Sequence, residues 1–138
     1  MAGYLLETNV ISETRKIRAD PAVLTFLGAA DVAALFLSVL TLGELRKGVA
    51  ARRRIDPVTA DQLGTWVAGI ETTYADRVLP VDTSVARIWG ELSAGRSLPA
   101  IDTLIAATAM VHGLTLVTRN TRDVELTGVP VIDPWQVR

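Results

Sequence analysis

The chain has 138 residues, the length of one domain at about 100–200 residues per domain. It is 49% hydrophobic but only 5% aromatic, so its core must be aliphatic, and the absence of cysteine excludes disulfides, thiolate metal sites and thiol nucleophiles. The 14 Lys and Arg against 15 Asp and Glu give a net charge of −1, which excludes a strongly basic, sequence-blind DNA-coating protein. The same balance does not exclude a nucleic-acid enzyme whose acidic residues are concentrated in one place.

No segment has the pattern of a membrane span or an export signal. The longest apolar runs, such as residues 32–42, contain polar breaks and fall short of about 18 residues. The N-terminus lacks a basic region followed by a long apolar one. We therefore expect one domain over residues 1–138, in the cytoplasm and without membrane contact.

Strand and helix patterns alternate along the chain. Short apolar runs predict strands at residues 3–6, 34–39, 77–81, 114–117 and 129–132. Capping residues and prolines predict helices that begin near Glu7, Asp20, Thr41, Pro57, Asp82 and Pro99. This alternation predicts an α/β fold with a parallel sheet between layers of helices, in which ligands bind beyond the carboxyl ends of the strands.

Four acidic residues, Glu7, Glu44, Asp102 and Asp123, follow predicted strands or begin predicted helices. Each also has a structural interpretation. Glu44 lies three residues after Thr41, as in a capping box, and this interpretation is as good as a metal-binding one. Glu7 and Asp123 taken alone fit an ordinary helix start and a turn cap.

Asp102 is the most informative of the four. The segment 101–111 is apolar nearly all round, which predicts a buried helix. A lone ionised carboxylate there would cost several kcal/mol unless it were paired or bound a metal. The helix dipole returns only about 0.3–1 kcal/mol, so a metal or polar-site role is favoured over a simple cap.

Other common sites are missing from the sequence. There is no glycine-rich dinucleotide fingerprint and no P-loop, and with His112 as the only histidine a zinc site or histidine triad is nearly excluded. The four acids together suit Mg²⁺ or Mn²⁺, which prefer oxygen ligands. Without a cation, neighbouring carboxylates would raise each other's pKa.

Four sequence blocks carry a resemblance to a known family: YLLETNVIS at 4–12, SVLTLGELRKG at 38–48, PAIDTLIAATA at 99–109 and LVTRNTRD at 116–123. In this order and at this length, they resemble the PIN-domain ribonucleases, and within them the VapC and FitB toxins of bacterial toxin–antitoxin pairs. The resemblance implies a three-layer α/β/α fold with a parallel sheet of four to five strands. It also implies a Mg²⁺- or Mn²⁺-dependent endoribonuclease toxin in which water activated by the metal hydrolyses an RNA phosphodiester.

By position, the resemblance places the metal-binding and catalytic acids at Glu7, Glu44, Asp102 and Asp123, supported by the polar residues Thr8, Asn9, Thr118 and Asn120. Arg46, Lys47, Arg119 and Arg122 lie in the same blocks and are candidate contacts to RNA phosphates. The arginines at 52–54 are better explained as a solvated helix end. The implied partners are RNA, a second copy of the chain and a cognate antitoxin, with operator DNA contacted only through the antitoxin.

The family pattern has Asp where this chain has Glu7. The extra methylene shifts the carboxylate by about an ångström, and errors of that size can cost about 10²-fold in rate. Glu7 is then either a natural variant with altered metal geometry or an introduced change that reduces toxicity. A second hypothesis follows, in which the chain is a catalytically weakened subunit that acts mainly in antitoxin binding and operon autoregulation.

Setting the four acids aside changes the charge balance of the remaining chain. They leave 11 acids against 14 bases, or +3. The near-neutral total is then the sum of an acidic pocket and a mildly basic, arginine-rich remainder.

Overall fold

A computed structural model describes residues 3–136. Its centre is a parallel sheet in the order β3-β2-β1-β4-β5. The strands are β1 (Tyr4–Leu6), β2 (Leu35–Ser38), β3 (Val78–Leu79), β4 (Thr115–Val117) and β5 (Val131–Ile132). The helices are α1 (Thr8–Glu13), α2 (Pro21–Ala29), α3 (Val39–Arg53), α4 (Pro57–Thr73), α5 (Thr83–Ser93), α6 (Ala100–Val111) and α7 (Thr121–Val124), with short 3₁₀ turns η1 (Val32–Ala34) and η2 (Glu125–Thr127). The predicted α/β/α fold with a parallel sheet is confirmed.

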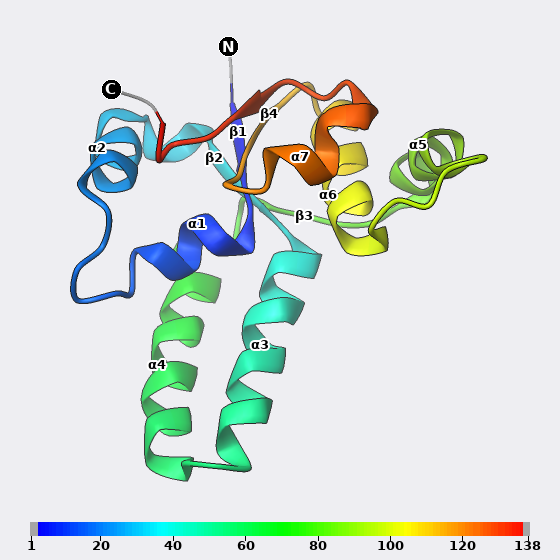
Figure 1. Cartoon of the computed structure of the whole chain (residues 1–138). Coiled ribbons are helices and arrows are strands. Elements are labelled where there is room, and N and C mark those ends of the chain that lie inside the picture. Colours follow the sequence, from blue (N-terminus) through cyan, green and yellow to red (C-terminus); the bar gives the residue numbers. More distant parts are fainter. Residues whose placement is uncertain (1–2, 137–138) are drawn as a thin grey trace.

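The two faces of the sheet are covered by different helices, as Figure 1 shows. Leu6 and Val117 join a core with residues of α1, α2, α3 and α4. Leu5 and Leu116, their neighbours along the strands, join a separate core with residues of α6 and α7. Successive residues of a strand point to opposite faces, so these central strands are apolar throughout.

Helices α3 and α4 form a hairpin that extends beyond the carboxyl ends of β2 and β1 (Figure 1). Two ion pairs join the helices on their exposed sides. Arg46 binds both carboxylate oxygens of Glu71, and Arg53 lies 2.8 Å from Asp61. None of the helices within residues 3–136 combines the length and the apolar character needed to span a membrane.

Several predicted boundaries need correction. The third strand is only Val78–Leu79, and helix α3 begins at Val39 because Ser38, not Thr41, accepts the capping hydrogen bond from the Leu40 amide at 3.0 Å. Thr41 is fully buried inside the helix. The capping box that we considered for Glu44 is therefore wrong, which frees the Glu44 carboxylate for another partner.

Candidate active site

The two segments that follow strands β1 and β4 meet at the carboxyl edge of the sheet. Strands β1 and β4 pair in register from Tyr4 to Leu6, and the pairing continues one step further, since the Glu7 amide donates to the Val117 carbonyl at 3.0 Å. This contact places Glu7 beside Thr118. Neighbouring parallel strands thus bring together two polar residues that are 111 positions apart in the chain.

Glu7 is held by a buried hydrogen-bond network. The Thr118 hydroxyl donates to Glu7 Oε2 at 2.7 Å, and Asn9 Nδ2 lies 3.4 Å from the same oxygen. Asn9 Nδ2 also donates to Thr118 Oγ1 at 3.2 Å, and the Asn120 amide donates to that hydroxyl oxygen at 3.0 Å. Of the four supporting residues expected from the sequence, Asn9, Thr118 and Asn120 lie in this network, whereas Thr8 contacts Glu44 instead. We predicted that a side-chain oxygen would cap α1, but Glu7 makes no such bond because its carboxylate faces this network instead.

The buried position of Glu7 changes the pKa of its carboxyl group. The side chain is only 3% exposed, and burial raises its pKa from 4.5 to about 7, against the lowering effect of the Thr118 hydrogen bond. The negative charges of Asp102 and Glu44 raise the pKa further. The second oxygen, Oε1, is buried and has no hydrogen-bond partner within the described part of the chain.

Glu44 occupies the opposite, exposed side of the site, in the second turn of α3. Its Oε1 accepts a hydrogen bond of 2.6 Å from the Thr8 hydroxyl at the start of α1. This bond links α1 to α3. Thr8 therefore supports Glu44, whereas Asn9 and Thr118 support Glu7.

Asp102 interacts electrostatically with Glu7, Glu44 and Asp123. It is half-buried in the first turn of α6, where no side chain caps the helix. Burial raises the pKa of Asp102, and the charges of Asp123 and then Glu44 raise it as well. Glu44, Asp102 and Asp123 thus each raise the pKa of another acid of this group, as expected for carboxylates gathered at one edge of a sheet.

The acids are close enough to interact but are not arranged as a finished ligand set. Within residues 3–136, no three acidic or histidine side chains are grouped tightly enough to hold one metal ion as they stand. The donor chemistry nevertheless fits a divalent cation, since the site is made of carboxylate oxygens. Burial first and the neighbouring carboxylates second raise the pKa values of Glu7 and Asp102, and Glu7 Oε1 has no partner among the described residues. A cation bound here would offset both effects.

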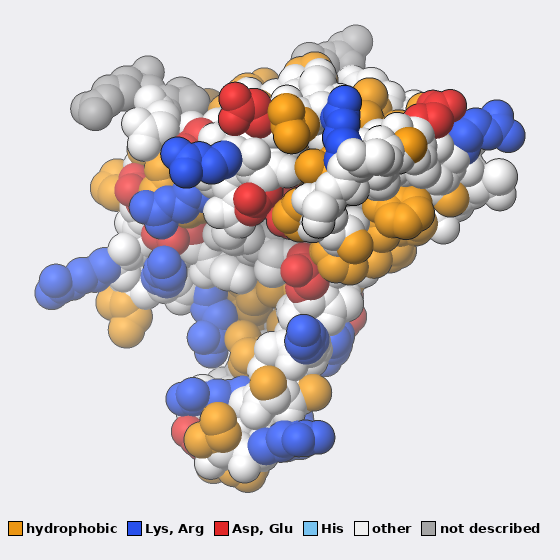
Figure 2. Space-filling model, turned by 45° about the vertical axis from the view of Figure 1, so that its right-hand side comes forward, with side chains coloured by type: hydrophobic (Ala, Val, Ile, Leu, Met, Phe, Trp, Pro, Cys, Tyr) orange, Lys and Arg blue, Asp and Glu red, His pale blue; other side chains and the backbone are white. Residues whose placement is uncertain are grey.

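Lys and Arg side chains lie on the same face of the molecule as several acidic ones, beside an apolar area (Figure 2). Of the four candidate RNA contacts, Arg46 is engaged with Glu71, and Arg119 lies over the Trp135 ring with its guanidinium carbon 4.9 Å from the ring centroid. Lys47 lines a surface cavity next to Glu44, and Arg122 is exposed on α7. Lys47 and Arg122 are thus the more available of these cations.

Two cavities adjoin Glu44, one on each side of the Thr8–Glu44 pair. The larger, of about 620 Å³, lies over α3 and the start of α6 and includes Lys47 and Ile101 in its wall. The smaller, of about 290 Å³, lies between α1, α3 and α4 and is lined by Arg15 and Trp66 among others. No sequence pattern marks Arg15 or Trp66 as functional, since neither lies in a motif block and only the packing of α4 brings them together.

A family model for the PIN domain matches residues 4–128. The chain is 37% identical to "VapC ribonuclease Y4jK" of Sinorhizobium fredii, over 96% of this chain and 97% of the relative. It is 34% identical to "Toxin FitB" of Neisseria gonorrhoeae, over 95% and 97%.

Solved structures also match over nearly the whole chain. The crystal structure of FitAcB from Neisseria gonorrhoeae superposes with a TM-score of 0.88 at 34% identity, covering 97% of this chain and 99% of that one. A toxin–antitoxin complex from Klebsiella pneumoniae has a TM-score of 0.68 at 25% identity, covering 98% and 100%. Fold and site therefore define an α/β protein with an acidic group at its strand ends. The chain belongs to the PIN-domain family, and within it to the VapC and FitB group.

Proposed function

We propose that this chain is a Mg²⁺- or Mn²⁺-dependent endoribonuclease toxin that hydrolyses RNA phosphodiester bonds and is neutralised by a cognate antitoxin. The observation that carries the proposal is the gathering of Glu7, Glu44, Asp102 and Asp123 at the carboxyl edge of the sheet, where each acid affects the pKa of another or has its own pKa raised. The names of the relatives, a VapC ribonuclease and a toxin, support the same class of activity.

In this proposal the four acids hold the cation. When bound, the cation polarises the scissile phosphate and lowers the pKa of water. Thr118 and Asn9 fix the Glu7 carboxylate through its Oε2, and Oε1 has no hydrogen-bond partner among the described residues. Thr8 fixes Glu44 in the same way from the opposite side.

The surrounding cations bind the substrate. Lys47 and Arg122 are available to contact RNA phosphates, and Arg119 and Arg46 could join them only by giving up contacts with Trp135 and Glu71. Arginine suits this role because its planar guanidinium binds phosphate with two parallel hydrogen bonds. We further propose a homodimer that assembles with the antitoxin in the cytoplasm and meets operator DNA only through it.

The test is cleavage of a structured RNA in Mg²⁺ and in EDTA by the wild type, Asp102→Asn and Glu44→Gln. We expect cleavage in Mg²⁺ by the wild type alone, with losses of about 10²-fold or more in the variants because each removes a charge from the proposed cation site. Glu91→Gln is the matched control, since Glu91 is an exposed glutamate on α5. Cleavage that persists in both site variants would contradict the proposal.

Cation binding is measured separately from cleavage by thermal unfolding. Mg²⁺ should raise the Tm of the wild type and of Glu91→Gln, and much less that of Asp102→Asn, because a ligand that binds only the folded state stabilises it. Equal shifts in all three proteins would show that the cation does not bind through Asp102.

The second candidate function is a weakened subunit that acts mainly by binding the antitoxin. The observation that favours it is the buried Glu7, whose longer side chain reaches the Thr118 hydroxyl and whose pKa lies near neutrality. Glu7→Asp distinguishes the two functions. A rise in cleavage of about 10²-fold, with growth arrest on expression, would identify a catalytic site damaged by the extra methylene. No change in either measurement would favour binding.

A further inference from the structure

The smaller cavity beside Glu44 has a composition that the proposed cleavage site does not explain. Its floor is apolar, with Leu45, Leu63 and the half-buried Trp66. Its rim is polar and carries Ser12 and Arg15. A recess lined by an aromatic ring, a guanidinium and hydroxyl groups suits a flat, polar-edged molecule better than an aliphatic one.

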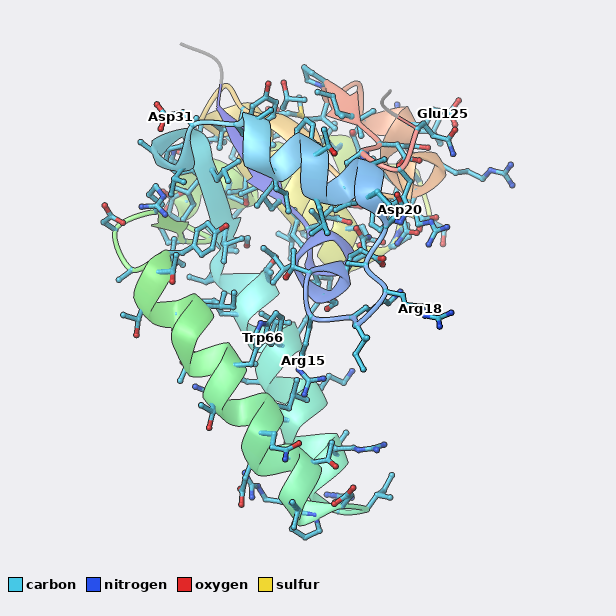
Figure 3. All side chains as sticks on the ribbon, turned by 90° about the vertical axis from the view of Figure 1, so that its left-hand side faces the viewer. Arg15, Arg18, Asp20, Asp31, Trp66 and Glu125 are labelled. Carbon is cyan, nitrogen blue, oxygen red and sulfur yellow. The ribbon has the colours of Figure 1, made fainter. Side chains whose placement is uncertain are left out.

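Arg15 and Trp66 both line this cavity, with the Arg15 guanidinium over the Trp66 ring. The Arg15 guanidinium carbon lies 5.9 Å from the Trp66 ring centroid, and Figure 3 shows the two side chains directed toward one another between α1 and α4. Arg15 has no acidic partner among residues 3–136, whereas its neighbour Lys16 is paired with Glu13 at 2.8 Å. Arg15 therefore keeps its charge available for a ligand.

The cavity is continuous with the acidic group. Thr8 and Glu44, joined by their 2.6 Å hydrogen bond, line both this cavity and the larger one on the other side. An RNA strand whose scissile phosphate lies at the acids would therefore have a recess on either side of Glu44. The volume of about 290 Å³ is at the small end for ligand pockets, which suits a single base.

We propose that this cavity is a base-binding subsite, in which a nucleotide next to the scissile phosphate stacks its base on Trp66 beside the Arg15 guanidinium. Single-stranded RNA is recognised in this manner, by stacking of unpaired bases on aromatic rings and arginine planes and by hydrogen bonds to base edges. The hydroxyls of Ser12 and Thr8 are placed to contact those edges. The subsite rests on the proposed ribonuclease function and adds to it residues that set where the RNA is cut.

The experiment places one abasic nucleotide at successive positions of a single-stranded RNA. Affinity is measured by fluorescence anisotropy in EDTA, where no cleavage is expected, for the wild type, Arg15→Gln, Trp66→Leu and Trp66→Phe. We expect one position at which the missing base weakens binding to the wild type about tenfold, the loss of one stacked base. In Arg15→Gln and Trp66→Leu, an abasic nucleotide at this position should weaken binding no more than at other positions. Trp66→Phe should keep part of the difference.

Arg18→Gln is the matched control for Arg15→Gln. Arg18 lies on the same connecting segment and points into solvent away from the cavity (Figure 3). Its substitution by glutamine removes the same charge as Arg15→Gln. The Arg18→Gln variant should show the same dependence on the abasic position as the wild type, with an equally small loss of affinity for every RNA because one positive charge is missing. Trp66 also packs against the core, so Arg15→Gln, whose side chain is exposed, keeps the test valid if Trp66→Leu unfolds.

Cleavage of the same RNAs in Mg²⁺ separates this proposal from the function on which it rests. Normal cleavage together with an unchanged abasic profile in Arg15→Gln and Trp66→Phe would overturn the subsite alone. Unchanged RNA binding combined with weaker retention of the cognate antitoxin would overturn it in favour of a protein segment. A wild type that neither binds nor cleaves RNA would overturn both proposals.

Discussion

The two sides of the acidic site are built differently. Glu7 stands at the end of a central strand, is 3% exposed, and is bound by side chains from two segments. Glu44 stands on a helix, is exposed, and is held by one hydroxyl, that of Thr8. One carboxylate is fixed by the register of the sheet and the other by the docking of α1 on α3.

The difference in environment makes the ionised form of Glu7 less stable in the folded protein than that of Glu44. A buried carboxylate without a cation is destabilised by desolvation, while an exposed one keeps its hydration. Changes on the Glu7 side should therefore alter folding stability and its pH dependence. Changes on the Glu44 side should alter activity with little effect on folding.

The largest effect is expected from Glu7→Gln in the metal-free protein. Folded Glu7 has a pKa of about 7, against 4.5 for an ordinary glutamate, so between these values the folded state binds the proton more tightly than the unfolded state. This contribution is fully present below pH 4.5 and is lost as the pH rises to about 7, a loss of about 3 kcal/mol in the free energy of unfolding. Glutamine does not titrate, so the variant should lack this part of the pH dependence.

Urea unfolding at pH 5 and pH 8, in EDTA, measures the effect as the difference between variant and wild type. Glu91→Gln is the control, since this exposed glutamate should leave the pH dependence unchanged. If the free energy of unfolding changed equally between pH 5 and pH 8 in Glu7→Gln and the wild type, Glu7 would be ionised in the folded protein well below pH 7.

An intermediate effect is expected from Thr118→Val. The fully buried Thr118 hydroxyl donates to Glu7 and accepts from Asn9 and from the Asn120 amide, so removing it leaves several polar groups without a partner. We expect a loss of about 2 kcal/mol in urea unfolding. The loss should be larger at pH 8 than at pH 5, because this hydrogen bond stabilises the ionised Glu7.

Thr118→Ser keeps the hydroxyl and serves as the control. It should recover most of the stability and of the pH dependence. Equal losses in the valine and serine variants would assign the effect to packing of the threonine methyl group instead.

Much of this arrangement is predictable from the sequence. The strand at residues 4–6 and the acid that follows it are predicted from a buried apolar run ending in a polar residue, and parallel strands must end at one edge of the sheet. That rule brings Glu7 and Thr118 together without any knowledge of the structure. The network between them is a consequence of pairing in register from Tyr4 to Leu6.

The parts of the prediction that were wrong or incomplete depend on contacts between elements that are distant in the chain. Ser38 and Thr41 are both good capping residues, and the choice between them follows from β2, which pairs with β3 through Ser38 and Leu79 and so ends just before Val39. Likewise Arg15 and Trp66 meet only because α4 folds back along α3. Neither local propensity nor periodicity contains that information.

The smallest effect on stability is expected from Thr8→Val, on the exposed side of the site. The Thr8–Glu44 hydrogen bond lies in solvent, where water replaces it readily, so its loss should cost about 0.5 kcal/mol or less in urea unfolding. Cleavage in Mg²⁺ should nevertheless fall by about tenfold, the usual cost of removing a residue that orients a ligand. Thr8→Ser keeps the hydroxyl and should retain both properties. A loss of stability as large as that of Thr118→Val would mean that α1 depends on this bond to fold, and the contrast between the buried and exposed acids would then not hold.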